Sequence, residues 1–137
     1  MIDFTQIKVW QKAHLVTLDV YRATNGELRR DRSLAAQTRR AAASVSTNIV
    51  EGCGASSQNE LARYLQMALS SAGELEYRLL LSHDLTYLTT QRYEGLRSQV
   101  QEVKRMLTGF IRSVRAREAK RQRDMRRDPP DEQGPDT

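Results

Sequence analysis

No proline interrupts the first 128 residues of this 137-residue chain, because its three prolines are Pro129, Pro130 and Pro135. Proline is the strongest helix breaker, so nothing upstream of residue 129 prevents long helices. Apolar residues recur there at helical spacing, and no competing strand pattern is present. The sequence therefore predicts an all-α protein.

The apolar periodicity predicts four helices, over about residues 5–23, 31–51, 57–83 and from residue 89 or 90 onward. Short turns join them, which makes an antiparallel up-and-down four-helix bundle the simplest packing. The fourth helix has the most regular pattern, a coiled-coil-like seam with spacings of three and four. The expected core is Leu34, Thr38, Ala41, Val45 and Ile49, then Leu61, Leu65, Ala68, Ala72, Leu75 and Leu79, then Tyr93, Leu96, Val100, Val103, Leu107, Phe110 and Val114.

Residues 35–76 are rich in Ala and Ser and contain a Gly-Cys-Gly stop. Small side chains let helix backbones approach closely, so this tract predicts tight packing rather than an open catalytic cleft. Gly52 and Gly54 are expected to take left-handed conformations that end the second helix. Ser57 and Glu60 then match a capping box that starts the third.

The first helix has a narrow polar arc, with apolar residues around most of its circumference. A surface helix of a monomer normally buries only one apolar stripe. We therefore expect a homo-oligomer, with Ile7, Trp10, Leu18 and Tyr21 as candidate interface residues.

The charge of the chain, formally +5, is unevenly distributed. Residues 1–114 are expected to form the bundle, and residues 115–137 a basic arm followed by an acidic, proline-containing disordered tail. Clustered cations can bind nucleic-acid phosphates, although basic residues also suit solvated helix ends. The candidate nucleic-acid-binding residues are Arg29, Arg30, Arg32 and Arg40 in the body, and Arg112, Arg115, Arg117, Lys120, Arg121, Arg123, Arg126 and Arg127 in the arm.

No convincing catalytic or metal-binding set is present, and we expect neither enzymatic activity nor a cofactor. Cys53 lacks an evident activating base, and a metal site needs more converging ligands than the two histidines provide. Glu74 and Glu76 point in different directions on a helix. Arg39 and Arg40 are expected to pair with such carboxylates, and the aromatic residues to lie in the core. The single cysteine and the absence of a long apolar run favour a cytoplasmic protein without a membrane span.

Several stretches resemble the bacterial four helix bundle protein family, also described as proteins encoded in intervening sequences of 23S ribosomal RNA genes. The resemblance covers about residues 4–114 and excludes the basic arm. Its most specific part is a block of residues 48–52, Asn-Ile-Val-Glu-Gly, followed by Glu-Leu-Glu at 74–76. Further matching stretches are FTQIKVWQKAH at 4–14, Gln37, residues 39–42, Ser44, ELARYL at 60–65, Ala68 and Ser71.

This resemblance implies a four-helix bundle that assembles into a ring-shaped homopentamer. A related branch of the family serves diversity-generating retroelements, where it contacts nucleic acid and a reverse transcriptase. We therefore expect a non-enzymatic ring protein that binds RNA or DNA through basic surfaces. The alternative is a purely structural or protein-interaction module, such as an accessory subunit of a reverse transcriptase, without nucleic-acid affinity of its own.

Overall fold

The computed structural model of the protein describes residues 2–127, apart from the side chains of residues 27 and 28. Its four α-helices are α1 (Lys8–Asn25), α2 (Arg32–Cys53), α3 (Gln58–Asp84) and α4 (Thr90–Arg127). Two short 3-10 helices, η1 (Phe4–Gln6) and η2 (Glu27–Arg30), flank α1. No strand occurs in this part of the chain, and the predicted all-α fold is confirmed.

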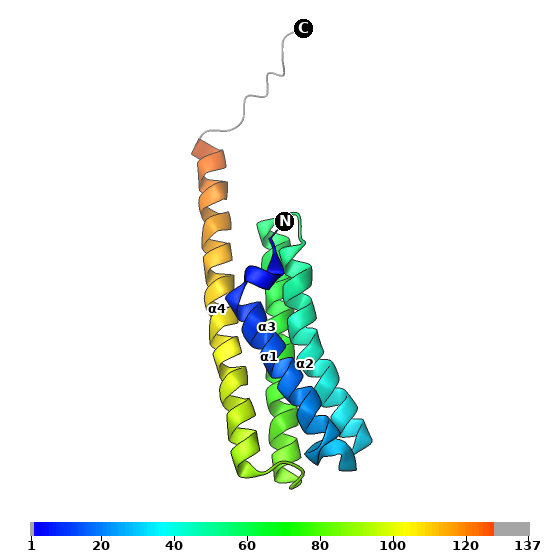
Figure 1. The fold of residues 1–137 in the computed structure, drawn as a ribbon. Coiled ribbons are helices and arrows are strands. Elements are labelled where there is room, and N and C mark those ends of the chain that lie inside the picture. Colours follow the sequence, from blue (N-terminus) through cyan, green and yellow to red (C-terminus); the bar gives the residue numbers. More distant parts are fainter. Residues whose placement is uncertain (1, 128–137) are drawn as a thin grey trace.

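The helices form an antiparallel bundle in which each helix contacts its neighbours in the sequence, and α1 also contacts α4. Figure 1 shows α1 crossing the front of the bundle between α2 and α4, with α3 behind it. Helices α1 and α3 are therefore diagonal to each other. Their outward faces point to opposite sides of the molecule.

The core follows the predicted stripes closely. Every residue expected in the core of α2 and α3 is buried, and so are five of the seven expected on α4. Tyr93 and Phe110 are only half-buried, and Ile111 takes the inward position next to Phe110. The physical reason is that an α-helix drifts by about 20° per heptad against a strict repeat of 3.5 residues.

Gly52 is required for space rather than for an unusual backbone conformation. No glycine has a positive φ in the described chain, and Gly54 lies at φ −88°, so the predicted left-handed glycine stop is wrong. Instead α2 continues through Cys53. A Cβ atom at Gly52 would lie 3.0 Å from Leu61 Cδ1 and 3.2 Å from Tyr64 Cβ. Helix α2 can therefore approach α3 closely where these two helices meet.

Small polar side chains make the other close helix contacts. The hydroxyl groups of Ser44 on α2 and Ser71 on α3 are 2.8 Å apart. Those of Thr17 on α1 and Ser46 on α2 are 2.9 Å apart. The expected tight packing of the small-residue tract is confirmed, with hydrogen bonds satisfying the hydroxyl groups that it brings between helices.

Side chains cap the start of three helices. The carboxylate of Asp31 accepts from the backbone N–H of Leu34, and the hydroxyl of Thr89 accepts from that of Arg92. The hydroxyl of Ser57 accepts from the N–H of Glu60 as predicted. The carboxylate of Glu60, however, lies 3.4 Å from the hydroxyl of Ser56, so the observed contacts supply only the Ser57 half of the capping box.

More of the apolar surface of α1 is buried within the single subunit than the sequence analysis expected, but part of it stays exposed. Val16 and Val20 are enclosed within the single subunit, and Trp10 is half-buried. Leu15 and Leu18 remain 55% and 36% exposed. The surplus apolar surface of this helix is therefore narrower than predicted and centred on its outward side.

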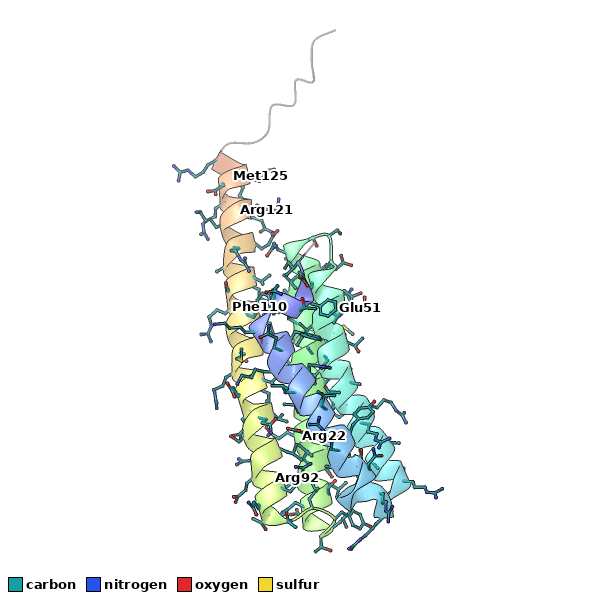
Figure 2. All side chains as sticks on the ribbon, viewed as in Figure 1. Arg22, Glu51, Arg92, Phe110, Arg121 and Met125 are labelled. Atoms are coloured by element: carbon teal, nitrogen blue, oxygen red, sulfur yellow. The ribbon has the colours of Figure 1, made fainter. Side chains whose placement is uncertain are left out.

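Helix α4 continues without a break past the expected domain boundary at residue 114 and ends at Arg127. The part that carries Arg121 and Met125 extends beyond the ends of α2 and α3 (Figure 2). Residues 112–127, hereafter the basic arm, thus continue helix α4 from the bundle. The disorder predicted for residues 128–137 lies outside the described residues.

Candidate functional site

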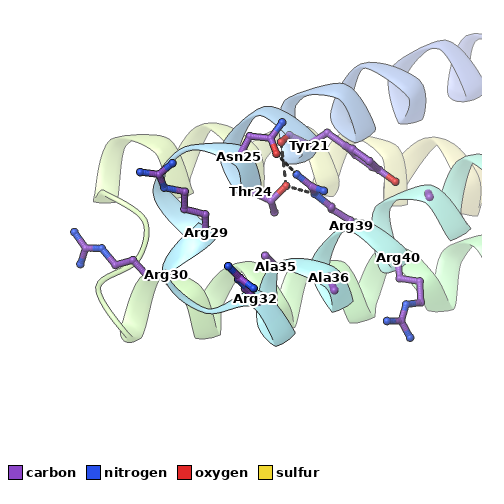
Figure 3. A pocket seen from close by; sticks show the side chains of 11 residues that line it. Tyr21, Thr24, Asn25, Arg29, Arg30, Arg32, Ala35, Ala36, Arg39 and Arg40 are labelled. Carbon is purple, nitrogen blue, oxygen red and sulfur yellow. Dashed lines mark hydrogen bonds between the residues drawn. The ribbon is translucent and has the colours of Figure 1, made fainter.

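A groove of about 860 Å³ lies beside the junction of α1, η2 and α2. Figure 3 shows the α1 residues Tyr21, Thr24 and Asn25 on one side and the α2 residues on the other. We call it the arginine groove, because every charged side chain among its described lining is an arginine. The lining residues are Tyr21, Thr24, Asn25, Arg29, Arg30, Arg32, Ala35, Ala36, Arg39, Arg40 and Ala43.

Arg39 organises the wall of the arginine groove. Its guanidinium donates to the hydroxyl of Thr24 and to the side-chain oxygen of Asn25, both at the end of α1. The same guanidinium lies over the ring of Tyr21, 4.9 Å from its centroid. Arg39 therefore ties α1 to α2, but through neutral partners and an aromatic ring rather than through the predicted carboxylate.

The other four arginines of the groove are exposed, and the described residues include no ion pair that uses them. Figure 3 places Arg30 and Arg40 at opposite ends of the groove, with Arg29 and Arg32 between them. Three other arginines of the body are paired, namely Arg22 with Asp19, Arg63 with Glu60 and Arg78 with Glu74. The groove thus gathers positive charge that the described carboxylates do not neutralise.

The basic arm is a second positive surface, at the opposite end of the bundle (Figure 1). Glu118 occupies the seam position that follows Val114 and is only 7% exposed. Arg121 donates two hydrogen bonds to its carboxylate, at 2.9 and 3.0 Å, and Gln122 donates a third. The hydrogen bonds from Arg121 hold the pKa of Glu118 below its usual value.

Most cations of the arm lie on the side of α4 that faces away from this seam. At 100° per residue, Val114 and Glu118 define the inward side, Arg121 lies nearest to it, and Arg115 and Arg117 lie on its two flanks. The remaining arm cations are exposed. They form one outward stripe, composed of Arg112, Lys120, Arg123, Arg126 and Arg127.

The cysteine and the two histidines, which could have chemical roles, are each engaged in packing within the bundle. Burial raises the pKa of the Cys53 thiol and so disfavours its thiolate form. The His14 ring stacks on Trp10, and His83 stacks on Tyr93 while its Nε2 lies 3.1 Å from Thr90 Oγ1. Over the described residues, no three potential metal ligands converge.

The acidic residues of α3 pair with cations nearby. Glu74 pairs with Arg78, and Glu76 lies 3.7 Å from Lys104 of α4 rather than beside an arginine. These contacts account for both carboxylates within the bundle.

No helix in residues 2–127 combines the length and apolar character that crossing a bilayer demands.

The structure sorts the predicted site residues into separate places. Arg29, Arg30, Arg32 and Arg40 share one groove, and the arm residues form a distinct surface at the other end. Of the candidate interface residues, Ile7 and Trp10 pack partly against the subunit's own core, whereas Leu18 and Tyr21 are exposed.

Sequence reasoning missed the role of Tyr21 beside the groove. The aromatic residues were expected in the core, but Tyr21 is 41% exposed and Trp10, Tyr64, Tyr93 and Phe110 are half-buried. The apolar character of the first helix concealed the position of Tyr21, because the partner that orients it, Arg39, is distant in sequence.

Comparisons with known proteins agree with this architecture. The model of the 23S rRNA-intervening sequence protein family matches residues 5–109. A crystal structure from the S23 ribosomal protein family, from Bacteroides thetaiotaomicron and of unknown function, is similar with a TM-score of 0.70. It shares 26% sequence identity, and the alignment covers 75% of this chain and 97% of that one. No curated protein matches at a significant level.

Proposed function

Because the chain belongs to the 23S rRNA-intervening sequence protein family, we propose that it is a non-enzymatic ring protein that binds RNA or DNA. The observation that carries this proposal is the gathering of exposed arginines in the arginine groove and along the outward stripe of the arm. Cations in such density bind nucleic acid by releasing the counterions condensed on its phosphates. A cytoplasmic location fits this role.

Assembly into a ring is supported by where the exposed apolar side chains lie. Leu15 and Leu18 lie next to each other on α1, whereas Tyr77 and Leu80 lie next to each other on the diagonal helix α3. Two different patches on opposite faces suit a heterologous contact, in which the α1 patch of one subunit meets the α3 patch of the next. Such contacts close into a ring when the rotation allows, and the family resemblance favours five subunits.

The assembly can be tested with variants that each remove one patch. Leu15→Ser with Leu18→Ser removes the α1 patch, and Tyr77→Ser with Leu80→Ser removes the α3 patch. Each variant alone is expected to sediment as a monomer. An equimolar mixture is expected to form a dimer and no larger species, because only one intact pair of patches remains. A monomeric wild-type protein, or rings formed by either variant, would contradict the heterologous contact.

Nucleic-acid binding can be tested by its dependence on salt. If the arm contacts about six phosphates, the log–log slope of affinity against salt is about −4 to −5. Removing four outward arginines of the arm (Arg112, Arg123, Arg126 and Arg127, each to Ala) is expected to flatten this slope markedly. The matched control replaces four cations that already have carboxylate partners (Lys12, Arg22, Arg63 and Arg78, each to Ala) and is expected to change the slope little.

The result also separates the two classes of function. A salt slope near zero in the intact protein would reject nucleic-acid binding. The exposed apolar patches would then favour the alternative, a structural or protein-interaction module such as an accessory subunit of a reverse transcriptase.

A further inference from the structure

The arginine groove combines its positive rim with an apolar interior. Ala35, Ala36 and Ala43 line it from α2, and their methyl groups offer a surface without charge or hydrogen-bonding groups. The phenol ring of Tyr21 borders the same space from α1 (Figure 3). A site that bound phosphate alone would gain nothing from these groups, because phosphate oxygens seek donors and cations.

The Tyr21 ring is held in a fixed position. Arg39 lies over the ring, and Arg39 itself is fixed by its hydrogen bonds to Thr24 and Asn25. The residue nevertheless keeps 41% of its surface exposed. An aromatic ring that is already oriented loses little entropy when a flat partner stacks on it.

Four exposed arginines border the groove that this ring lines. Arg32 and Arg40 are eight residues apart on α2, which separates them by about 12 Å along the helix axis. Arg29 and Arg30 extend the positive rim onto η2. The rim is therefore long enough to contact more than one phosphate of a strand whose base enters the groove.

These features discriminate between single-stranded and double-stranded nucleic acid. A base inside a duplex is stacked between its neighbours, so only an unpaired base can place its face on an aromatic side chain. The basic arm provides a contrast, because residues 112–127 include no aromatic side chain at all. The arm therefore offers phosphate contacts only, whereas the groove offers a stacking surface as well.

We propose that the arginine groove binds an unpaired nucleotide of an RNA or DNA strand, with its base against Tyr21 and the alanine surface and its phosphates on the surrounding arginines. This rests on the proposed nucleic-acid function and deepens it, since it makes single-stranded segments the preferred ligand. Tyr21 then acts in ligand binding rather than in the subunit interface.

The test uses the full chain and measures the affinity for a labelled short oligoadenylate and for a duplex of equal charge. Tyr21→Ala is expected to weaken oligoadenylate binding about 5- to 150-fold, the loss given by removal of one base–aromatic stack. Tyr21→Phe should retain the affinity, and duplex binding should change less than twofold. Met67→Ala, which removes an exposed apolar side chain of α3 outside the groove and outside the proposed subunit contact, is the control.

Other outcomes overturn the inference and remain distinguishable from failure of the proposed function. If binding depends on salt but the affinities for oligoadenylate and duplex are equal, the unpaired-nucleotide site is rejected while the proposed function stands. The same holds if Tyr21→Ala does not change the affinity for oligoadenylate. A change in sedimentation with Tyr21→Ala would assign Tyr21 to the subunit interface. Displacement of the oligoadenylate by equimolar AMP would indicate a mononucleotide site instead.

A second measurement does not depend on the folding of a variant. Photo-crosslinking of the wild-type protein to a strand that carries 4-thiouridine is expected to label the peptide containing Tyr21. Labelling confined to the basic arm would overturn the inference. If the wild-type protein binds neither ligand, the proposed function itself fails.

Discussion

Replacing single glycines by alanine tests the helix packing most directly, because the structure predicts opposite signs at different positions. Gly52 and Gly109 both lie inside helices, where Gly→Ala alone stabilises by about 1 kcal/mol. At Gly109 an added Cβ meets nothing within 4 Å. Gly109→Ala is therefore expected to raise the free energy of unfolding by up to about 1 kcal/mol.

At Gly52 the added methyl group would be crowded. The nearest atom, Leu61 Cδ1 at 3.0 Å, ends a flexible side chain, but Tyr64 Cβ at 3.2 Å lies next to the backbone of α3 and cannot move independently. Overpacking of this kind costs about 1–3 kcal/mol, which exceeds the gain in helix propensity. Gly52→Ala is therefore expected to be neutral or to destabilise by up to about 2 kcal/mol.

The assay is urea unfolding followed by circular dichroism, at one protomer concentration because assembly couples to stability. Gly54→Ala serves as a third variant. Gly54 has an ordinary φ of −88° and no neighbour nearer than 3.7 Å to an added Cβ, so its replacement should cost little. If Gly52→Ala stabilised as much as Gly109→Ala, the close approach of α2 and α3 would be refuted. A large loss at Gly54 would instead restore the left-handed glycine stop.

Three further predictions address other contacts. Thr86 has a φ of 65°, which a β-branched residue adopts at a cost of about 1–2 kcal/mol, so Thr86→Gly should raise the urea midpoint; a lower midpoint would refute this strain. Arg39→Ala should destabilise by about 0.5–1.5 kcal/mol, because it removes the hydrogen bonds to Thr24 and Asn25, whereas Arg40→Ala should have little effect. The pKa of Glu118 is lowered in the folded protein. Its contribution to stability is therefore fully present above the pKa of an ordinary glutamate, and it is lost as the pH falls through the lowered pKa of the folded state. The stability difference between wild type and Glu118→Gln should therefore disappear in acid, and a difference independent of pH would refute the Glu118–Arg121 interaction.

The sequence by itself determined the number of helices, their direction and nearly the whole core. The reason is that these properties depend on local signals: apolar spacing, the cap at Ser57, and the absence of proline before residue 129. The two groups of basic residues, around residues 29–40 and 112–127, were also evident from the sequence. Each such signal depends on residues close together in the sequence, so it can be recognised without knowing which helix packs against it.

Only the tertiary structure decided how distant residues share space. Gly52 is a glycine because Tyr64 of another helix lies against it, not because of its own backbone angles. Tyr21 borders the arginine groove because Arg39, eighteen positions away, stacks on its ring and is fastened to Thr24 and Asn25. The apolar periodicity of α1 places Tyr21 on an apolar face. Which part of that face α2 and α4 cover depends on the angle at which α1 crosses the bundle. That crossing is a property of packed helices and is not encoded in the pattern of either helix alone.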